Sequence, residues 1–373
     1  MGAAARECCR GPALRTADYN PGMESSLPAA HRSASPAPTL EDVAAAAGVS
    51  RATVSRVING IPSVKAAAAA AVAKAVEELG YRPNTAARLL AGGRTGSVAL
   101  ILTEPDLSSI GGSFFALPLR GVMTGIAKAS KQLVMLLASD SDEDESRLLG
   151  YLKAGHVDGA MVVLEAHSSY LPDQLAAAPL PVVYLGRPPE DPELFSYVDV
   201  DNYAGGRIAA QELVDAGRKR IAHIAGPTDL GVAIDRTAGW REVMRENALA
   251  DDAVAYADFS VEGGAAAMEE LLGRFPDLDA VFVSSDLMAV GALRVIRASG
   301  RQVPQDISMV GYDDLIVAST LEPPLTSVRQ PLEQMGSMMV DTLLKLLASP
   351  GAPPMSRVIT PELTRRSSVA PPA

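Results

Sequence analysis

Apolar runs of strand length alternate with amphipathic segments of helix length from Val98 onward. Such alternation predicts βαβ units, in which a parallel sheet carries helices on both faces. The pattern occurs twice, over about 97–190 and about 205–330, so we expect two α/β lobes. The segment RPPEDPELFSYVDVDNYAGG between them is predicted as the crossover. The strand-like runs are SVALIL, QLVMLLA, GAMVVL, PVVYLG, RIAHIAG, AVFVS and SMVGY.

Residues 39–80 have helical periodicity instead, with short breaks. Thr39 is suited to cap a first helix, LEDVAAAA, whose first turn is acidic, as the helix dipole prefers. Gly48 allows a left-handed turn, and Ser50 is suited to cap a second helix, RATVSRVI. Two short helices joined by AGVS predict a helix-turn-helix, whose second helix enters the major groove of DNA. The alternative is a small three-helix interaction module with surface arginines.

The second of these helices carries side chains suited to DNA. Arg51 can form a bidentate hydrogen bond with guanine, whereas Ala52 offers only a methyl group. Thr53 and Ser55 can donate to phosphate, and Arg56 lies one turn beyond Ala52. We therefore predict DNA contacts along this helix and at its end, from Ser50, Arg51, Ala52, Thr53, Ser55, Arg56 and Asn59.

The composition is that of a packed globular protein, since 48% of the 373 residues are apolar. No run of 18 apolar residues exists and the first residues lack a signal-like apolar run, so we expect no membrane partner and no export. The two cysteines, Cys8 and Cys9, are adjacent and cannot form a disulfide framework, which fits a cytoplasmic location. Residues 1–38 are predicted to be a disordered leader, and Met1 and Met23 both stay open as the natural start.

Charge is distributed unevenly along the chain. The total is −11 at pH 7, yet residues 39–94 carry seven cations and four anions, a net charge of +3. Residues 1–38 carry four cations and three anions, or +1, which leaves about −15 for everything after residue 94. A mildly basic head on an acidic body is compatible with DNA binding in spite of the negative total.

Several stretches, in order, resemble the lac repressor (LacI) family of transcription regulators. They are TLEDVAAAAGVSRATVSRVING, EELGYRPNTAARLLAGGRTGSVALI, GPTDLGVAIDRTAGW, SSDLMAVGALRVIRASGRQVPQDISMVGYDD and PPLTSVRQPLEQMG. The resemblance runs from Thr39 to near Pro371. It implies an all-α helix-turn-helix head over 39–83, a hinge over 84–95 and a bilobed α/β core, similar to periplasmic binding proteins and built on parallel sheets, over 96–373.

The resemblance also implies that PNTAARLLAGG is a hinge that is disordered off DNA and helical on the operator of a dimer. Leu90 would then be the wedge that opens a central step in the minor groove, with Arg88 beside it among the DNA contacts. The alternative for Leu90 is an ordinary linker leucine.

One departure from the family lies at the start of the third helix. The family pattern is V-S-P-x-T-R, whereas this chain has Lys65 followed by the run Ala66–Ala71. Alanine keeps the helix, and the apolar positions Val72, Val76 and Leu79 keep helical spacing, but the missing cap costs about 1 kcal/mol. Because hydroxyl and Arg groups near phosphate are also missing, we expect operator binding to depend less steeply on salt than in relatives.

Polar and aromatic residues follow several predicted strands, where the carboxyl ends of parallel strands form ligand sites. Carboxylate and guanidinium groups opposite an aromatic ring suit a sugar, because its hydroxyls take hydrogen bonds and its apolar face packs on the ring. By resemblance, positions matching Arg236, Phe259, Ser285 and Asp313 contact the effector. Phe115 and Arg187 also follow strands and join the candidates, so the predicted site is Phe115, Arg187, Arg236, Phe259, Ser285 and Asp313.

Each candidate has an alternative role. Asp313 could cap a helix, Arg236 could form a surface ion pair, Phe259 could pack in the core, and Arg187 could be an exposed loop residue. Asp286 is expected to cap the helix LMAVGALRVI. Trp240 and His223 are expected to be structural.

No catalytic constellation, P-loop, GxGxxG after a strand or metal-ligand spacing is present, so we expect no enzyme activity and no cofactor or metal. The prediction is a ligand-responsive transcriptional regulator, expected to be a repressor, that binds a palindromic operator as a homodimer and senses a small carbohydrate. The chain ends without a heptad tail, which favours a dimer over a tetramer. Two alternatives are an effector-independent regulator whose core only dimerises and a solute-binding protein, which would need an export signal and lack the head.

Overall fold

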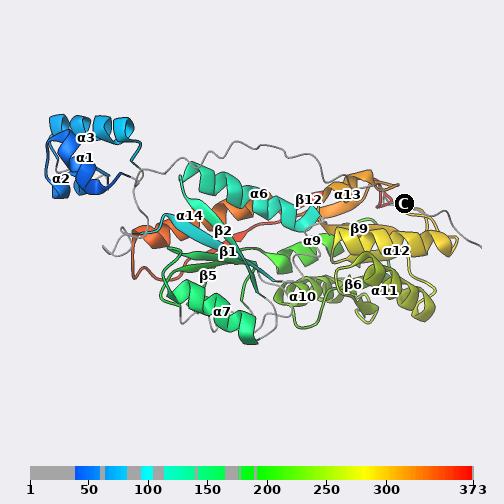
Figure 1. The fold of residues 1–373 in the computed structure, drawn as a ribbon. Coiled ribbons are helices and arrows are strands. Elements are labelled where there is room, and N and C mark those ends of the chain that lie inside the picture. The colour runs from blue at the N-terminus through cyan, green and yellow to red at the C-terminus, as the bar shows by residue number, and fades with distance from the viewer. Residues whose placement is uncertain are drawn as a thin grey trace, which may run out of the picture. The chain divides into compact units, whose positions relative to one another are not determined.

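The computed structural model describes residues 38–58, 64–81, 94–103, 113–138, 142–163, 175, 178–188 and 191–371. They form two compact units, one within residues 1–84 and one within 85–373 (Figure 1). Nearly all of the predicted leader and hinge lies outside the described residues. The same holds for three predicted DNA contacts, Asn59, Arg88 and Leu90.

The first unit is a bundle of three helices, α1 (Leu40–Ala47), α2 (Arg51–Ile58) and α3 (Ala66–Leu79). Thr39 caps α1 in a capping box, because the Asp42 amide donates to its hydroxyl and its own amide donates to the Asp42 carboxylate at 2.8 Å. Gly48 has a φ of 62°, the left-handed conformation that glycine favours. The Ser50 hydroxyl accepts from the Thr53 amide at 3.2 Å. The predicted caps and turn are confirmed.

The third helix begins at the alanine run, and Lys65 at its N-cap makes no side-chain capping bond. Val72 is fully buried and Val76 partly buried, as their spacing predicts. Leu79 was expected on the same apolar face, but it is 38% exposed. The reason is that the helix ends there: Gly80 turns the chain and Tyr81 fills the core position instead.

The second unit contains two six-stranded sheets, each belonging to one lobe. The first-lobe sheet is entirely parallel, with the order β11-β5-β4-β3-β1-β2. Figure 1 shows α6 and α14 on one face of this sheet and α7 on the other. The bounds are β1 Ser97–Thr103, α6 Ser113–Lys128, β2 Gln132–Ala138, α7 Asp142–Lys153, β3 Ala160–Val163, β4 Val182–Leu185, a 3-10 turn Pro192–Leu194, β5 Ser196–Val200, α14 Leu332–Ala348 and β11 Ser356–Ile359.

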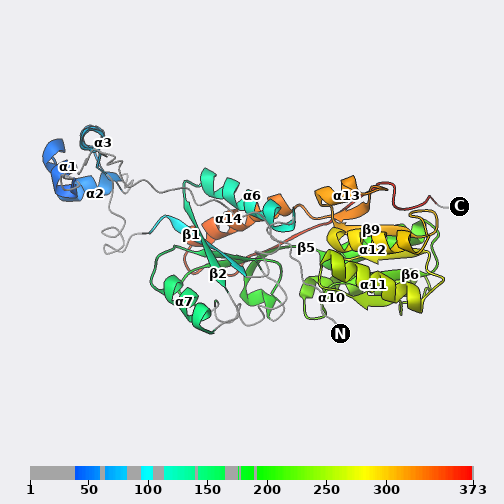
Figure 2. The ribbon, with the colours of Figure 1, turned by 45° about the vertical axis from the view of Figure 1, so that its right-hand side comes forward.

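The second-lobe sheet has the order β12-β10-β9-β8-β6-β7, and all its described pairs are parallel except β10–β12. Helices α9 and α10 cover one face. Helices α11 and α12, which lie side by side in Figure 2, cover the other. The bounds are α9 Asn202–Asp215, β6 Ile221–Ala225, α10 Gly231–Glu246, β7 Val254–Tyr256, α11 Val261–Arg274, β8 Ala280–Val283, α12 Asp286–Ala298, β9 Ser308–Asp313, α13 Ile316–Thr320, β10 Thr326–Arg329 and β12 Glu362–Thr364.

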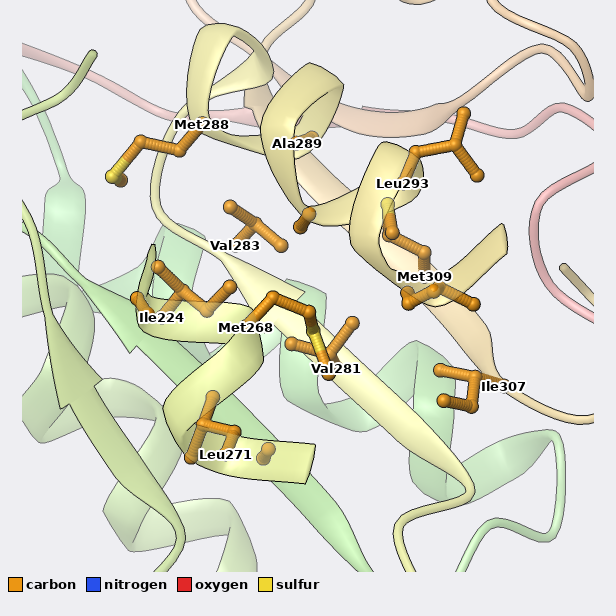
Figure 3. Packing of buried hydrophobic residues seen from close by; sticks show 14 of the residues in the cluster. Ile224, Met268, Leu271, Val281, Val283, Met288, Ala289, Leu293, Ile307 and Met309 are labelled. Carbon is orange, nitrogen blue, oxygen red and sulfur yellow. The ribbon is translucent and has the colours of Figure 1, made fainter. Parts of the chain in front are cut away.

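Alternate residues of the central strands build the cores on the two faces of the second-lobe sheet. Val281 and Val283 point to α11 and α12, where Met268 and Leu293 pack against them (Figure 3). On the opposite face the core includes Trp240, so the structural role predicted for it is confirmed. Within the described ranges, no helix is both long enough and apolar enough to cross a membrane.

His223 of β6 is also structural, as predicted. It is fully buried between the rings of Trp240 and Phe282, and its ring nitrogens lie 3.1 Å from the Phe282 carbonyl and the Thr237 hydroxyl. Burial lowers the pKa of His223 to about 3, which keeps the imidazole neutral in the core.

The chain passes between the lobes three times, which corrects the single crossover expected from the sequence. It leaves the first lobe after β5, returns after β10 to form α14 and β11, and crosses again into β12. The predicted crossover segment itself contains β5, whose five residues are all buried. The two lobes are therefore joined by three closely placed connections, at residues 200–202, 329–332 and 359–362.

Candidate functional site

A buried ion pair lies at the carboxyl end of the second-lobe sheet. Arg236 of α10 and Asp313, the last residue of β9, are each 4% exposed, and their Nη1 and Oδ1 atoms are 3.9 Å apart. Arg236 Nε donates to Asn202 Oδ1 at 2.9 Å, and Nη1 donates to the Ser284 carbonyl at 2.7 Å. The sequence alternative of a surface ion pair for Arg236 is therefore wrong.

The aromatic ring of Tyr312 lies against one face of the Arg236 guanidinium. The Arg236 Cζ atom lies 3.7 Å from the centre of the Tyr312 ring, a cation–π contact in a desolvated site. The Tyr312 hydroxyl donates to Asn202 Oδ1 at 3.3 Å. The planar Arg236 guanidinium contacts the ring on one face and donates hydrogen bonds through two of its nitrogens, so it has little freedom to rotate.

The Asp313 side chain is also fixed by a neighbouring residue. Gln330 Nε2 donates to Asp313 Oδ1 at 2.7 Å. The backbone of Asp313 has a φ of 102°, a strained conformation of the kind that clusters at functional sites. Burial raises the pKa of Asp313 to about 6, although Arg236 and the bond from Gln330 both act to lower it.

The start of α12 corrects one assignment. Ser285, not Asp286, is the N-cap, since its hydroxyl accepts from the Met288 amide at 3.2 Å. The Asp286 carboxylate accepts instead from the Leu315 amide and the Ser327 hydroxyl, both at 2.7 Å. Asp286 lies one position too late in the chain to cap α12. Its carboxylate instead connects the start of α12 to the segment after β9. Burial, and secondarily the Asp313 carboxylate, raise the pKa of Asp286 well above its usual range.

Phe259 lies in the loop after β7 and has a φ of 65°. Its ring is seated on Gly226, just after β6, so closely that a Cβ there would lie 2.3 Å from the ring Cζ atom. The ring is partly buried against the core that includes α11 and α12. The alternative of core packing for Phe259 is confirmed, and the residue also lies near the edge of the sheet where the strands end.

Arg187 follows β4 of the first lobe and reaches the second lobe. Its Nη2 forms an ion pair with the Asp235 carboxylate of α10. Its amide donates to Asp199 Oδ2 at 3.2 Å, and burial raises the pKa of Asp199 to about 6. Arg187 is an exposed loop residue, as its alternative expected, and its side chain also links the two lobes.

Phe115 lies in a different environment from the polar candidates. It is 6% exposed in the first-lobe core, where it meets Phe114 edge to face. With Leu100, Leu102 and Met339 it lines an apolar pocket of about 180 Å³. The described contacts of Phe115 are those of a core residue.

The candidate DNA-reading face of α2 is accessible. Ser50, Arg51, Ala52 and Arg56 are exposed, and Thr53 and Ser55 are half-buried. Arg51 Nε lies 3.1 Å from Glu41 Oε1, and both side chains are more than half exposed, so this pair contributes at most about 1 kcal/mol and can be exchanged for a DNA contact.

Four residues of the site were not predicted, namely Asn202, Ser284, Tyr312 and Gln330. Two of them are side-chain amides at connections between the lobes. Ser284 precedes the capping serine; its hydroxyl is fully buried and has no hydrogen-bond partner among the described residues. The sequence signal was positional and partial: Ser284 and Gln330 directly follow β8 and β10, whereas Asn202 lies two positions after β5 and Tyr312 is the second-to-last residue of β9.

Two families match the chain. Residues 39–84 match "Bacterial regulatory proteins, lacI family", and residues 210–369 match "Periplasmic binding protein-like domain". The transcriptional regulator CelR of Thermobifida fusca is 46% identical over 334 residues, which cover 89% of this chain and 98% of CelR. The ribose operon repressor of Escherichia coli strain K12 is 33% identical, over 88% of this chain and 99% of the repressor.

Solved structures agree with these relatives. A CelR–cellobiose complex superimposes with a TM-score of 0.70 at 44% identity, covering 89% of this chain and 99% of that one. A lac repressor dimer bound to operator and the anti-inducer ONPF gives a TM-score of 0.74 at 28% identity, with the same coverage.

A helix-turn-helix head followed by a two-lobed α/β core, with a buried polar site where the strands end, defines a DNA-binding transcription regulator and not an enzyme. The chain belongs to the lacI family of bacterial regulatory proteins.

Proposed function

We propose that this protein is a cytoplasmic repressor that binds a palindromic operator as a homodimer and releases it when a small carbohydrate occupies the site at Arg236 and Asp313. Cellobiose is the first candidate effector, because a CelR structure that is 44% identical holds cellobiose. The observation that carries the proposal is the buried Arg236–Asp313 pair at the carboxyl ends of parallel strands.

The chemistry of the site suits a polyol. A guanidinium offers donors in a fixed plane and a carboxylate offers acceptors, so adjacent sugar hydroxyls can bond to both. The Phe259 ring lies at the same edge of the sheet and offers an apolar face to a pyranose ring. The effector contacts proposed are Arg236, Phe259, Ser285 and Asp313. Arg187 is proposed to contribute from the first lobe.

Regulation follows from linkage between the two sites. A ligand that prefers one arrangement of the lobes shifts the population towards it, and thereby changes the affinity of the heads for DNA. The DNA contacts proposed are those on α2, with Arg51 at a base edge, together with Asn59, Arg88 and Leu90, which lie outside the described residues.

Thermal unfolding with a panel of sugars tests the proposal. Cellobiose at 100 times its dissociation constant should stabilise the protein by about 2.7 kcal/mol, and ribose at the same concentration should not. Asp313→Ala should abolish the stabilisation by cellobiose and still bind operator DNA. If no sugar stabilises the wild type while the operator is bound normally, the core is a dimeriser without an effector.

A further inference from the structure

Two of the three connections between the lobes carry a buried side-chain amide, and each amide is bonded to one half of the ion pair. Asn202 is the first residue of α9, immediately after the 200–202 connection, and is 2% exposed. Gln330 lies between β10 and α14, in the 329–332 connection, and is 7% exposed. Asn202 holds Arg236, and Gln330 holds Asp313. We call these two residues the crossover amides.

Asn202 uses both ends of its amide. Its Nδ2 donates to Asp199 Oδ1 at 3.2 Å and to the Val200 carbonyl at 3.1 Å, both on β5 of the first lobe. Its Oδ1 accepts from Arg236 and Tyr312 of the second lobe. One planar group therefore connects the last strand before the connection to the cluster beyond it.

Gln330 makes a similar link on the return path. Its side chain donates to Asp313 Oδ1, and its backbone carbonyl accepts from the Leu332 amide at 2.9 Å. Leu332 begins α14 and is 2% exposed in the first-lobe core. A shift of Asp313 is thus passed through Gln330 to the helix that carries the chain back into the first lobe.

We propose that the crossover amides are positioning residues that couple occupancy of the Arg236–Asp313 site to the relative orientation of the two lobes. The inference rests on the proposed function, because it assigns the means by which the effector acts. A ligand that bonds to Arg236 and Asp313 competes for the same two side chains to which the crossover amides are bonded. The amides then change their own bonds, and each lies at a point through which the chain must bend for the lobes to move.

A purely structural role predicts a different pattern. Removing a local hydrogen bond loosens the segment that contained it and lowers stability, but it leaves the other connection unchanged. Coupling through the ion pair requires that a change at Gln330 be felt at Asn202, about 130 positions away in the chain, because Gln330 bonds to Asp313, Asp313 pairs with Arg236, and Arg236 bonds to Asn202. Tyr312, the neighbour of Asp313 in the chain, bonds to Asn202 as well.

Gln330→Met is the test variant, because methionine keeps the length and volume of glutamine and removes the side-chain bond to Asp313, while the backbone bond from the residue 330 amide to the Asp313 carbonyl remains. Gln211→Met is a matched control. Gln211 of α9 also donates a 2.7 Å bond to a carboxylate, that of Asp215, but within one helix. Both variants therefore lose one Gln–Asp hydrogen bond of the same length.

The first readout needs no effector. Amide hydrogen exchange is measured over residues 196–206, around the first connection, in the full-length protein. Gln330→Met should accelerate exchange there by roughly threefold or more, and Gln211→Met should not. Unchanged exchange over 196–206 in Gln330→Met overturns the inference. If Gln330→Met fails to fold, Asn202→Leu, which is similar in size and removes the acceptor facing Arg236, is measured over residues 326–334 with the same expectation.

The second readout is the ratio of operator dissociation constants with and without saturating cellobiose. In Gln330→Met this ratio should fall at least about fivefold towards one. Gln211→Met should keep the wild-type ratio. A full wild-type ratio in Gln330→Met contradicts the inference. A wild type that responds to no sugar instead refutes the proposed function, and the exchange measurement then decides the inference alone.

Discussion

The guanidinium carbon of Arg236 lies 3.7 Å above the centre of the Tyr312 ring, and both side chains are buried. Burial raises the pKa of Tyr312 above its usual range, so its hydroxyl remains a donor to Asn202. The orientation of Arg236 is therefore set before any ligand arrives, and a preorganised donor costs less entropy to bind.

The ring of Tyr312, more than its hydroxyl, should determine effector affinity. Tyr312→Leu removes the cation–π contact, worth about 2 kcal/mol when desolvated, and should weaken cellobiose binding roughly 30-fold. Tyr312→Phe keeps the ring and loses one long bond, so it should cost about 1 kcal/mol or less. Calorimetric titration of both variants checks this order, which equal losses would contradict.

Ser284 should behave differently in the free and the bound protein. Its hydroxyl is buried and has no hydrogen-bond partner in the part of the chain that the structure describes, and we expect it to bond to the effector. The carbonyl of the same residue accepts from Arg236. Ser284→Ala removes an unsatisfied polar group, so the ligand-free protein should be stabilised by about 1 kcal/mol, while cellobiose affinity falls about fivefold or more. Thermal unfolding and calorimetry measure the two effects. A variant that is destabilised without ligand and binds cellobiose normally would rule this role out.

Effector affinity should fall as the solution is acidified. Burial raises the pKa of Asp313 to about 6, so the native carboxyl binds its proton at a higher pH than the unfolded one does. Between about pH 4 and 6 the folded state holds more protons, and this group therefore lowers the free energy of unfolding as pH rises through that window. The ionised form is the one that accepts sugar hydroxyls, so cellobiose affinity should decrease below about pH 6, by up to about tenfold per unit.

The matched control for this titration is Asp199→Asn. Burial raises the pKa of Asp199 to about 6 as well, but Asp199 bonds to Asn202 and to the Arg187 amide and not to the proposed ligand. The pH dependence of cellobiose binding should persist in Asp199→Asn. If Asp199→Asn loses the pH dependence of cellobiose affinity, or if the wild-type affinity is constant from pH 5 to 8, the titrating group is one other than Asp313.

Operator binding should depend on salt less steeply than in relatives with the V-S-P-x-T-R pattern. The N-terminus of α3 has an uncapped Lys65 and then methyl groups. Each phosphate contact adds about 0.9 to the slope of log affinity against log salt. The variant Ala69→Arg adds a cation and leaves Lys65 in place, so it should steepen the slope by about 0.9 for each phosphate that the new arginine neutralises. Fluorescence anisotropy from low to high salt measures it, and identical slopes would show that α3 does not reach the phosphates.

Much of the fold follows from local sequence patterns. The strands β1, β2, β3, β4, β6, β8 and β9 coincide with continuous apolar runs. All of these except the partly exposed edge strand β2 are covered on both faces, which requires apolar residues throughout. Strands β5, β10, β11 and β12 were missed, since SYVDV, TSVR, SRVI and ELT are short and carry polar residues. The second and third passages between the lobes depend on which sheet pairs with β11 and which with β12. No short stretch of the sequence specifies that pairing.

The residues of the site, like the strands, fall into some that the sequence predicted and some that it could not. Resemblance identified Arg236 and Asp313, and the structure places them together in the buried pair. Asn202, Tyr312 and Gln330 could not be recognised, because their role is to hold another side chain across elements that are distant in the sequence. Leu79 was misassigned because helical spacing does not reveal where the helix ends.

The central claim is reciprocal linkage between operator and effector, and one measurement on the wild type tests it directly. The operator dissociation constant is determined with and without saturating cellobiose, and the cellobiose dissociation constant with and without saturating operator. The account predicts that cellobiose weakens operator binding by roughly 5–150-fold and that operator weakens cellobiose binding by the same factor. Sugar binding that leaves operator affinity unchanged would contradict it.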